Sequence, residues 1–371
     1  MAYVYAKTLE IKCEDQIKQY LDHPLFADTK VRIMPDVHLG KGSVIGFTAT
    51  CNEYVVPNLI GVDIGCGVSA FCLGRGAVPF DKLDKFIRKH IPAGKKVNDE
   101  IHPMLEEAYD YVGDYTLSFE VFMERVVALT DKFYIPTGRV LKAIGSLGGG
   151  NHFIEIDKDE EGCRWLLIHS GSRNLGLNVA TFHSELAVER THEDSSIKFL
   201  SGRAAEDYME DMKIAQLYAR VNRALMGIQI GWNYFKVGKT KLDCVESIHN
   251  YIDFENAVVR KGAISARKDE MVVIPFSMAD GAVIGKGCGN AEWNYSAPHG
   301  SGRKLSRTQA QGLSLDEYRK RMKNIWSSCV GKSTLDESPM AYKNTKEILE
   351  LLGDTVDVER RLMPVYNFKS S

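Results

Sequence analysis

The 371-residue sequence lacks the cysteine pattern of a disulfide framework or a zinc finger. Its eight cysteines are scattered from position 13 to position 329, and no two of them have C-x-x-C spacing. Most are therefore expected to be small buried side chains. Cys66 differs from the others because a glycine flanks it on each side and Asp63 precedes it by three residues.

The sequence also lacks an excess of charge of either sign and any long apolar run. Its 47 basic and 49 acidic residues give a net charge of −2, so affinity for nucleic acid would have to come from local basic patches. No stretch approaches the roughly 20 apolar residues of a membrane span, and the first residues do not resemble a signal peptide. We therefore expect a cytoplasmic protein without a membrane partner.

Linkers rich in proline, serine or charge are also missing, and neither a repeat nor a low-complexity segment is present. The composition, 44% hydrophobic and 26% charged, is that of a packed globular protein. Short β-type runs and helical patterns alternate irregularly, which predicts an α+β fold with mixed sheets in a single large domain over residues 1–371. Helices are expected at 81–90, near 103–132 and at 202–225, the last two as scaffold, and strands at 31–34, 44–48, 55–62, 68–73, 166–168, 271–275 and 283–284.

The residues that could perform chemistry gather in six short segments, most of them rich in glycine. Because glycine has no side chain and accepts positive φ, a polar residue beside it is usually presented to a ligand and not packed away. This clustering favours an enzyme. The segments are 34–42, 61–67, 148–155, 168–174, 249–251 and 299–307.

Three histidines, His152, His169 and His249, stand beside an asparagine or a serine at the edge of an apolar or glycine-rich run. Together with Asp63 and Cys66 they offer one oxygen, one sulfur and three nitrogen ligands. A thiolate between imidazoles can bridge two divalent ions, and the carboxylate suits Mn²⁺ or Zn²⁺. The alternative for each histidine is a satisfied core residue, and the residues alone leave both open.

Two segments have the features of a phosphate site. The glycines at 148–150, with Asn151, offer unobstructed backbone N–H groups, although a glycine triplet is often only a turn. His299 precedes a Gly-Ser-Gly loop and the basic residues Arg303, Lys304 and Arg307. An imidazole can attack a phosphorus while guanidinium groups offset the developing charge; the alternative is a basic surface loop.

Further cations and aromatic residues are expected near the same pocket. Arg173 follows His169, and planar guanidinium groups suit the phosphates of RNA ends. The other candidates are Arg260 and Lys261 as cations, and Tyr251, Trp293 and Tyr295 as residues that could stack on bases.

Taken in order, these motifs resemble those of the RtcB family of GTP-dependent RNA ligases, which join RNA 3′-phosphate or 2′,3′-cyclic phosphate ends to 5′-hydroxyl ends. The resemblance runs from Met34 to the C-terminus and implies an RtcB-like fold around a central metal and nucleotide pocket. It rests on Pro35-Asp36-Val37-His38, Gly61 to Gly67, Gly148 to Phe153, His169-Ser170-Gly171-Ser172-Arg173 and His299-Gly300-Ser301-Gly302-Arg303.

The resemblance implies a role for each site residue. Cys66 would bridge two Mn²⁺ ions, one completed by His169 and His249 and the other by Asp63 and His152. His299 would accept GMP from GTP, with Arg303 and Arg173 as catalytic cations. The residues expected to contact the nucleotide are Asn151, Phe153, Glu155, Asn250, Ser277, Gly300, Ser301, Gly302 and Lys369.

GMP would then pass to the RNA 3′-phosphate, and attack by the 5′-hydroxyl would join the ends, in tRNA splicing or RNA repair. An archease-type activator is a further partner that the resemblance suggests. The chain is also compact, and it departs from the family at Phe276-Ser277-Met278-Ala279 and at Ala282, which bears on guanine selectivity more than on metal binding.

Two other functions use the same pocket. A metal-dependent phosphoesterase that opens cyclic phosphates would need Asp63, Cys66 and the histidines but not His299. An RNA-binding or regulatory protein would keep the pocket without turnover. The intact segment from His299 to Arg307 favours the ligase.

Overall fold

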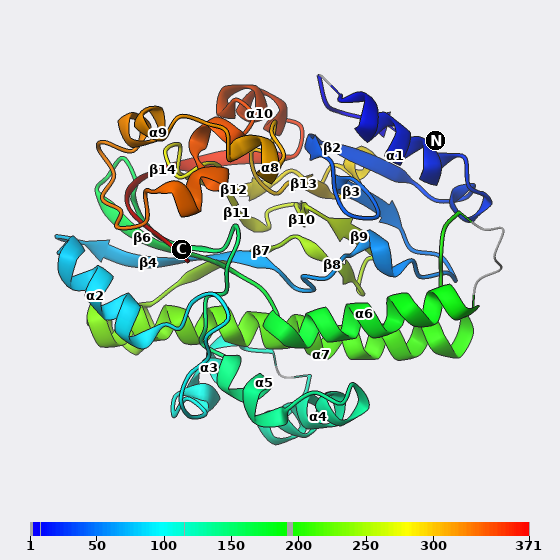
Figure 1. The fold of residues 1–371 in the computed structure, drawn as a ribbon, viewed down its shortest axis with the longest axis horizontal. Helices are drawn as coiled ribbons and strands as arrows, with labels where there is room; N and C mark the ends of the chain where they lie inside the picture. Colours follow the sequence, from blue (N-terminus) through cyan, green and yellow to red (C-terminus); the bar gives the residue numbers. More distant parts are fainter. Residues whose placement is uncertain (1–2, 8, 115, 191–195, 371) are drawn as a thin grey trace.

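The computed structural model of the chain describes residues 3–7, 9–114, 116–190 and 196–370. In these residues the strands form a central body with helices on two sides (Figure 1). Helices α6 (Arg173–Arg190) and α7 (Gly202–Ile228) run along one side, and the shorter helices α8 (Arg307–Ala310), α9 (Leu315–Arg321) and α10 (Thr345–Leu352) lie on the other. The predicted α+β class with mixed sheets is confirmed.

The largest sheet has seven strands, all antiparallel to their neighbours, in the order β11-β12-β14-β5-β6-β4-β7. Its edge strands β7 and β11 lie close to each other: the backbone N–H of Val273 on β11 donates to the hydroxyl of Ser247 on β7 at 2.9 Å. The sheet therefore curls nearly into a barrel. Its strands are β4 (Gly67–Arg75), β5 (Phe153–Lys158), β6 (Cys163–Ser170), β7 (Cys244–Ile248), β11 (Met271–Pro275), β12 (Ala282–Gly287) and β14 (Val356–Lys369).

A second sheet of five strands has the order β1-β2-β3-β9-β8, and β1 and β2 are parallel while the other pairs are antiparallel. A two-stranded sheet pairs β10 with β13. The strands are β1 (Tyr3–Val4), β2 (Val31–His38), β3 (Ile45–Thr50), β8 (Asn250–Asp253), β9 (Val258–Lys261), β10 (Ala263–Ser265) and β13 (Ser296–Pro298).

The long helix α7 is buried along much of its length and packs against one face of the largest sheet. Gly227 allows this contact, because a Cβ atom there would collide with the ring of Phe71 on β4. The remaining α-helices are α1 (Ile11–Leu21), α2 (Phe80–His90), α3 (Leu105–Val112), α4 (Phe119–Lys132) and α5 (Thr137–Ala143). Short helical turns are η1 (Pro24–Phe26), η2 (Pro57–Leu59), η3 (Gln229–Tyr234), η4 (Lys239–Lys241), η5 (Ala291–Trp293), η6 (Lys332–Glu337) and η7 (Pro339–Ala341).

Most predicted elements are confirmed, and two are wrong. The stretch 103–132 contains two helices, because Gly113 has a φ of 67° and ends α3 with a left-handed residue. The run 55–62 is not a strand: Pro57 starts the turn η2, and Val55 makes only an isolated bridge to Leu200. None of the helices in the described ranges combines the length and the apolar character needed to cross a bilayer.

Candidate active site

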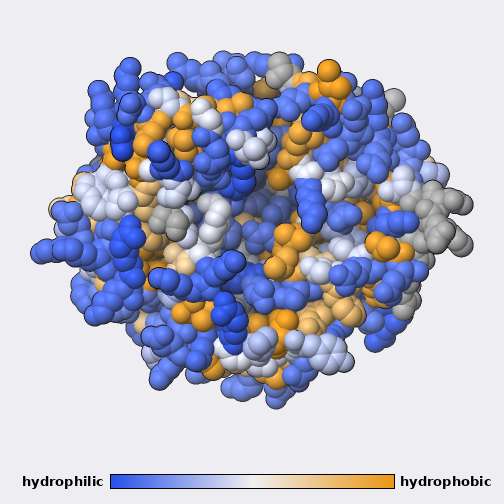
Figure 2. All heavy atoms as spheres, viewed as in Figure 1, coloured by the Kyte–Doolittle hydropathy of each residue, from blue (hydrophilic) through white to orange (hydrophobic). Residues whose placement is uncertain are grey.

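A cavity of about 590 Å³ lies between the sheets, consistent with the hollow near the centre of the face in Figure 2. All predicted site residues except His152 and Arg173 line it. The fold therefore brings together predicted site residues from both halves of the chain. The predicted residues that line it are Asp63, Cys66, Asn151, Phe153, Glu155, His169, His249, Asn250, Ser277, His299, Gly300, Ser301, Gly302, Arg303 and Lys369.

The sheet topology explains why the sulfur and imidazole residues meet. Cys66 immediately precedes β4, His152 immediately precedes β5, His169 is near the end of β6, and His249 directly follows β7. These four strands are neighbours in the order β5-β6-β4-β7, and each pair is antiparallel. The starts of β4 and β5 and the ends of β6 and β7 consequently lie at one edge of the sheet.

Cys66, His152, His169, His249 and Asp63, here called the imidazole–thiol cluster, have their ligand atoms within reach of one another. The Sγ of Cys66 lies 3.2 Å from Nε2 of His169 and 3.5 Å from Nε2 of His152. Nε2 of His169 is 3.3 Å from Nε2 of His249, and Nε2 of His152 is 3.1 Å from a carboxylate oxygen of Asp63.

The protonation states suit a metal centre. Nδ1 of His152 lies 2.8 Å from the carbonyl oxygen of Leu147, so its proton is held there and Nε2 keeps a free lone pair. Burial lowers the pKa of both His169 and His249 well below the ordinary value, which keeps their rings neutral. Neutral imidazole is the form that binds metal.

The sulfur and the carboxylate complete the donor set. Burial raises the pKa of the Cys66 thiol well above its ordinary value, so a thiolate there needs a neighbouring positive charge. Burial opposes ionisation of Asp63 too, but the neighbouring His152 ring, when it carries a second proton on Nε2, donates to the carboxylate and lowers the pKa of Asp63 to about 2. Sulfur, nitrogen and carboxylate donors that converge in a buried site fit divalent ions such as Mn²⁺ or Zn²⁺.

His299 follows β13 and lies beside the imidazole–thiol cluster. Its ring centroid is 4.9 Å from that of His249, and its Nδ1 is 2.6 Å from a carboxylate oxygen of Asp36 on β2. Asp36 is fully buried, and the backbone N–H of His299 also donates to it, at 3.2 Å. This contact is an ion pair at short distance without hydrogen-bond geometry, and a carboxylate so placed favours a proton on Nδ1 and leaves Nε2 available as a nucleophile.

Asp36 belongs to the motif Pro35-Asp36-Val37-His38, which by itself indicated no role for this residue. The signal was present, because Asp36 is a charged residue in the middle of the apolar run that forms β2. Gly302 belongs to the same arrangement, since a Cβ atom there would collide with the backbone of Asp36. Gly302 thus permits β2 and the loop that follows His299 to approach closely.

Glu337 also lines the cavity and contacts several cationic and aromatic side chains. It lies 2.6 Å from Arg307, 3.3 Å from Arg303, 3.3 Å from the ammonium of Lys369 and 2.7 Å from the hydroxyl of Tyr342. Burial opposes the ionisation of Glu337, but the charges of Lys369 and Arg307 lower its pKa to about 2. No segment of the sequence signalled this residue or Tyr342.

Lys369 also connects this network to the glycine segment, as its ammonium lies 3.3 Å from the carbonyl oxygen of Asn151 and 5.3 Å from the centre of the Phe153 ring. Glu155 accepts a hydrogen bond from the side-chain amide of Asn367 on β14. Asn367 was not predicted either. Phe153, Glu155 and Lys369 therefore line the cavity close together, and their contact with a nucleotide stays a prediction.

The two predicted catalytic arginines differ in position. Arg303 lines the cavity, but its guanidinium is bound to Glu337 and to the carbonyl oxygens of Leu305 and Asp336. Arg173 lies behind the glycine segment, where it donates to the hydroxyl of Ser146 at 3.1 Å and to the carbonyl oxygen of Gly94 at 2.7 Å. A catalytic role for either stays a prediction.

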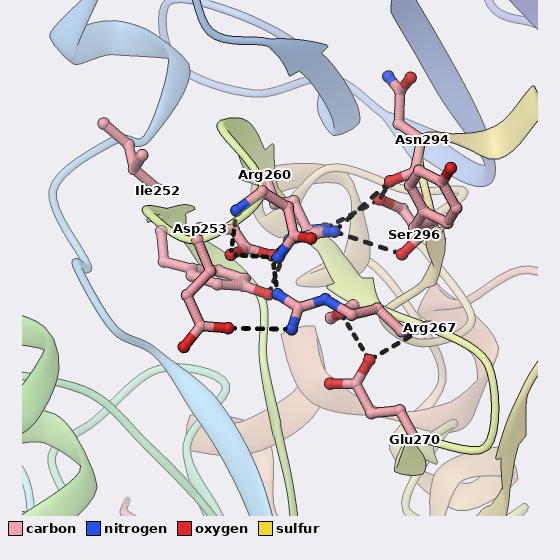
Figure 3. Close-up of polar contacts among 12 residues, drawn as sticks. Ile252, Asp253, Arg260, Arg267, Glu270, Asn294 and Ser296 are labelled. Carbon is pink, nitrogen blue, oxygen red and sulfur yellow. Dashed lines mark hydrogen bonds and ion pairs between the residues drawn. The ribbon is translucent and has the colours of Figure 1, made fainter. Parts of the chain in front are cut away.

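The expectation that Arg260 and Lys261 serve RNA phosphates is wrong. Arg260 is fully buried and donates to Asp253 at 2.9 Å, to Ser296 at 2.8 Å and to Tyr251 at 2.9 Å (Figure 3). The ammonium of Lys261 is likewise buried and donates to the backbone carbonyls of Lys41 and Asn58 and the hydroxyl of Ser43.

Of the aromatic residues proposed for base stacking, Tyr251 and Trp293 are occupied in the fold. Arg260 lies over the Tyr251 ring, and Trp293 is buried and stacks on Tyr5 with ring centroids 3.5 Å apart. Tyr295 is exposed, so its interaction with bases stays a prediction.

Comparison with known proteins agrees with this geometry. Residues 16–370 match the family model described as tRNA-splicing ligase RtcB. The RNA-splicing ligase RtcB of Escherichia coli K12 is 31% identical, over 88% of this chain and 87% of that protein. The tRNA-splicing ligase RtcB of Nanoarchaeum equitans is 27% identical, over 86% of this chain and 83% of that protein. The chain belongs to the RtcB family.

Proposed function

We propose that this chain is an RNA ligase that joins RNA 3′-phosphate or 2′,3′-cyclic phosphate ends to 5′-hydroxyl ends and uses GTP, a 3′-phosphate/5′-hydroxy nucleic acid ligase. Membership of a family whose relatives carry the names RNA-splicing and tRNA-splicing ligase supports this. The observation that carries it is His299, held by buried Asp36 beside the imidazole–thiol cluster. A site that only opened cyclic phosphates would not need this histidine.

The first step is attack by Nε2 of His299 on the α-phosphorus of GTP. A P–N bond forms, the bond to the β-phosphate oxygen breaks, and pyrophosphate leaves. The ring becomes positively charged as the bond forms, and Asp36 stabilises that charge through the Nδ1 proton. Two Mn²⁺ ions held by Asp63, Cys66, His152, His169 and His249 would stabilise the negative charge of the departing group.

The second and third steps use the energy of the P–N bond. An oxygen of the RNA 3′-phosphate attacks the phosphorus of the bound GMP, so His299 is released and a pyrophosphate linkage joins RNA to GMP. The 5′-hydroxyl then attacks the RNA phosphorus, loses its proton, and releases GMP. A cyclic end is first opened by water to the 3′-phosphate.

The nucleotide is expected to lie in the cavity against Phe153, Glu155 and Lys369, with backbone contacts from Asn151 and the glycine-serine loop at 300–302. The cavity is lined from Glu10 to Lys369, which supports one catalytic unit over residues 1–371. The proposal extends to a cytoplasmic enzyme acting in tRNA splicing or RNA repair, with an archease-type protein as activator.

The test is incubation of the purified protein with α-labelled GTP and Mn²⁺, followed by denaturing electrophoresis. We expect an acid-labile label on the wild type and none on His299→Ala. Asp36→Asn should retain a trace, reduced roughly 10²-fold, because the ring is still present but is less well oriented and stabilised. Ligation of RNA with a cyclic phosphate end should follow the same order.

The phosphoesterase alternative predicts a different result. Neither protein would carry label, both would open the cyclic phosphate at equal rates, and Cys66→Ala would abolish that opening. Label on His299→Ala would instead place the nucleophile elsewhere.

A further inference from the structure

Behind the wall of the nucleotide cavity lies a second carboxyl group, Asp157. It is two residues from Glu155 on β5, so both side chains project from the same face of the strand. Glu155 lines the cavity, whereas Asp157 is 0% exposed and does not line it. Neither carboxyl oxygen of Asp157 has a hydrogen-bond donor among the described residues.

The neighbouring strands explain why no donor reaches Asp157. The residues opposite Asp157 are Pro364 on β14, whose side chain has no donor, and Trp165 on β6. The indole N–H of Trp165 donates to Asp159 at 3.1 Å and is not available. An ionised carboxylate in such a place would be costly, because neither water nor a donor compensates its charge.

Glu155 lies within hydrogen-bonding reach of Asp157. Burial raises the pKa of both groups, that of Glu155 to about 7 and that of Asp157 well above its ordinary range. Asn367, which donates to Glu155, and Lys369 favour ionisation of Glu155 and not of Asp157. Lys369 is itself shared with Glu337. A buried carboxyl pair of this kind holds one proton between its members.

We propose that Asp157 is a neutral carboxylic acid that donates its proton in a hydrogen bond to Glu155, and thereby keeps Glu155 ionised to accept hydrogen bonds from guanine. Asp157 is a positioning residue in this role, since it acts through Glu155. The inference rests on the proposed function, in which the nucleotide lies against Glu155, and it takes the guanine of GTP as the part in contact with this carboxyl group.

The chemistry of the bases gives this arrangement its consequence. Guanine presents two donors, N1–H and the N2 amino group, and an ionised carboxylate offers two acceptor oxygens to match them. Adenine presents an acceptor at N1, which an ionised carboxylate repels. A protonated Glu155 would lose an acceptor and with it the preference for guanine, so the residue that holds the shared proton decides the base.

The first experiment measures calorimetric binding of GMP and AMP between about pH 6 and 8.5, a range that spans the Glu155 titration. Wild type, Asp157→Asn and Asp157→Leu are compared. GMP affinity of the wild type should fall as the pH drops below about 7. The asparagine keeps a donor and should keep this midpoint and the GMP preference. The leucine removes the donor, so the midpoint should rise and GMP affinity at pH 7 should fall roughly tenfold, as for loss of a hydrogen bond to a charged group, with recovery at higher pH.

Equal midpoints for the leucine and asparagine variants would overturn the proposal, since a packing role does not distinguish a donor from an apolar side chain. AMP affinity should change little in either variant. Glu155→Gln is the control, because it should remove the pH dependence altogether.

A second experiment does not need nucleotide. At pH 8, the infrared spectrum of the wild type should contain the carbonyl stretch of a protonated carboxylic acid that is absent from Asp157→Asn. Absence of that band from the wild type would overturn the proposal even if the leucine variant failed to fold. If the band is present but wild type binds neither GMP nor GTP, the assignment of the cavity to guanine nucleotide fails while the shared proton stands.

Discussion

Two buried polar clusters meet at the segment from His249 to Tyr251, and they differ in how completely their hydrogen-bonding atoms are paired. The imidazole–thiol cluster lies on one side. The arginine cluster, defined as Arg260 with its partners Asp253, Ser296 and Tyr251, lies on the other (Figure 3). Arg260 directs its guanidinium to these side chains and to the carbonyl oxygens of Asn294 and Tyr295.

In the imidazole–thiol cluster, by contrast, ligand atoms face other ligand atoms. His152 has already committed its Nδ1 proton to Leu147, and its remaining nitrogen points to the sulfur of Cys66 and to Asp63. Burial is therefore common to both clusters, and it does not separate a structural cluster from a functional one. The two clusters differ in whether each donor already faces an acceptor within the fold, as in the arginine cluster, or acceptor atoms face one another, as in the imidazole–thiol cluster.

The largest effect expected from this comparison is loss of metal in Cys66→Ala. Bound Mn²⁺ after dialysis, measured by mass spectrometry, should fall from stoichiometric to background, and labelling by GTP should disappear with it. Unfolding of the metal-free protein by urea should change by less than about 1 kcal/mol, because the sulfur makes only weak hydrogen bonds, to the neighbouring His152 and His169.

Cys13→Ala is the matched control, since Cys13 is equally buried but packs in the core between α1 and β2. It should retain metal. Full occupancy of Cys66→Ala by Mn²⁺ would show that the sulfur is not a ligand.

The second effect is the reverse of the first. Arg260→Met should lower the free energy of unfolding by about 3–5 kcal/mol, because it leaves the buried carboxylate of Asp253 without its main partner. The molecules that remain folded should bind Mn²⁺ as the wild type does. A loss below about 1 kcal/mol in urea denaturation would mean that the arginine cluster is not what stabilises this region.

The sequence predicted the imidazole–thiol cluster because each of its ligands has a local signal. Cys66 stands between glycines, and His169 ends a compact apolar run, so both could be placed at strand ends before their neighbours were known. The ordering of β5, β6, β4 and β7, which brings those ends together, could not be read from the residues. Only the structure shows it, because the family resemblance supplied the ligand set and no strand order.

The same local reasoning failed for Arg260. A cation that follows a histidine-containing segment looks like a phosphate ligand, and only the partner strands show that Asp253, seven residues earlier, and Ser296, thirty-six residues later, enclose it. Asp36, Glu337 and Asn367 were missed for a related reason. Each acts on a residue from a distant part of the chain, so although Asp36 stands out as a charge within an apolar run, no spacing within the sequence indicates the partner of any of the three.

The third prediction uses pH to measure how much the charge of Asp253 in the arginine cluster contributes to the free energy of unfolding. Burial opposes ionisation of Asp253, but the hydrogen bond from Arg260 lowers its pKa to about 2, below the ordinary value of 3.8. A folded-state pKa that is depressed contributes stability above the ordinary pKa, and that stability is lost as the pH falls toward 2. The contribution is about 2 kcal/mol by linkage.

Glu246 and Glu337 also have pKa values near 2, so the acid curve of the wild type alone does not isolate Asp253. The measurement is the difference in unfolding free energy between wild type and Asp253→Asn from pH 6 to pH 2. The two curves should be separated at pH 6 and should converge toward pH 2. A constant separation would indicate that the charge of Asp253 contributes nothing to stability.

The smallest expected effect concerns Arg267, which lies beside the arginine cluster, and it tests whether burial or distance decides the strength of an ion pair with Asp253. Arg267 reaches the same carboxylate oxygen of Asp253 as Arg260 does, at 2.6 Å instead of 2.9 Å, but its side chain is 36% exposed. Distance alone would rank Arg267 as the stronger partner. Solvent screens its charge, however, and Arg260 remains to satisfy Asp253 when it is removed, so Arg267→Met should cost about 1 kcal/mol or less. That cost should shrink further in high salt, whereas the cost of Arg260→Met should persist, because buried pairs are screened much less. Equal losses for the two variants would mean that the exposed arginine is energetically part of the buried cluster.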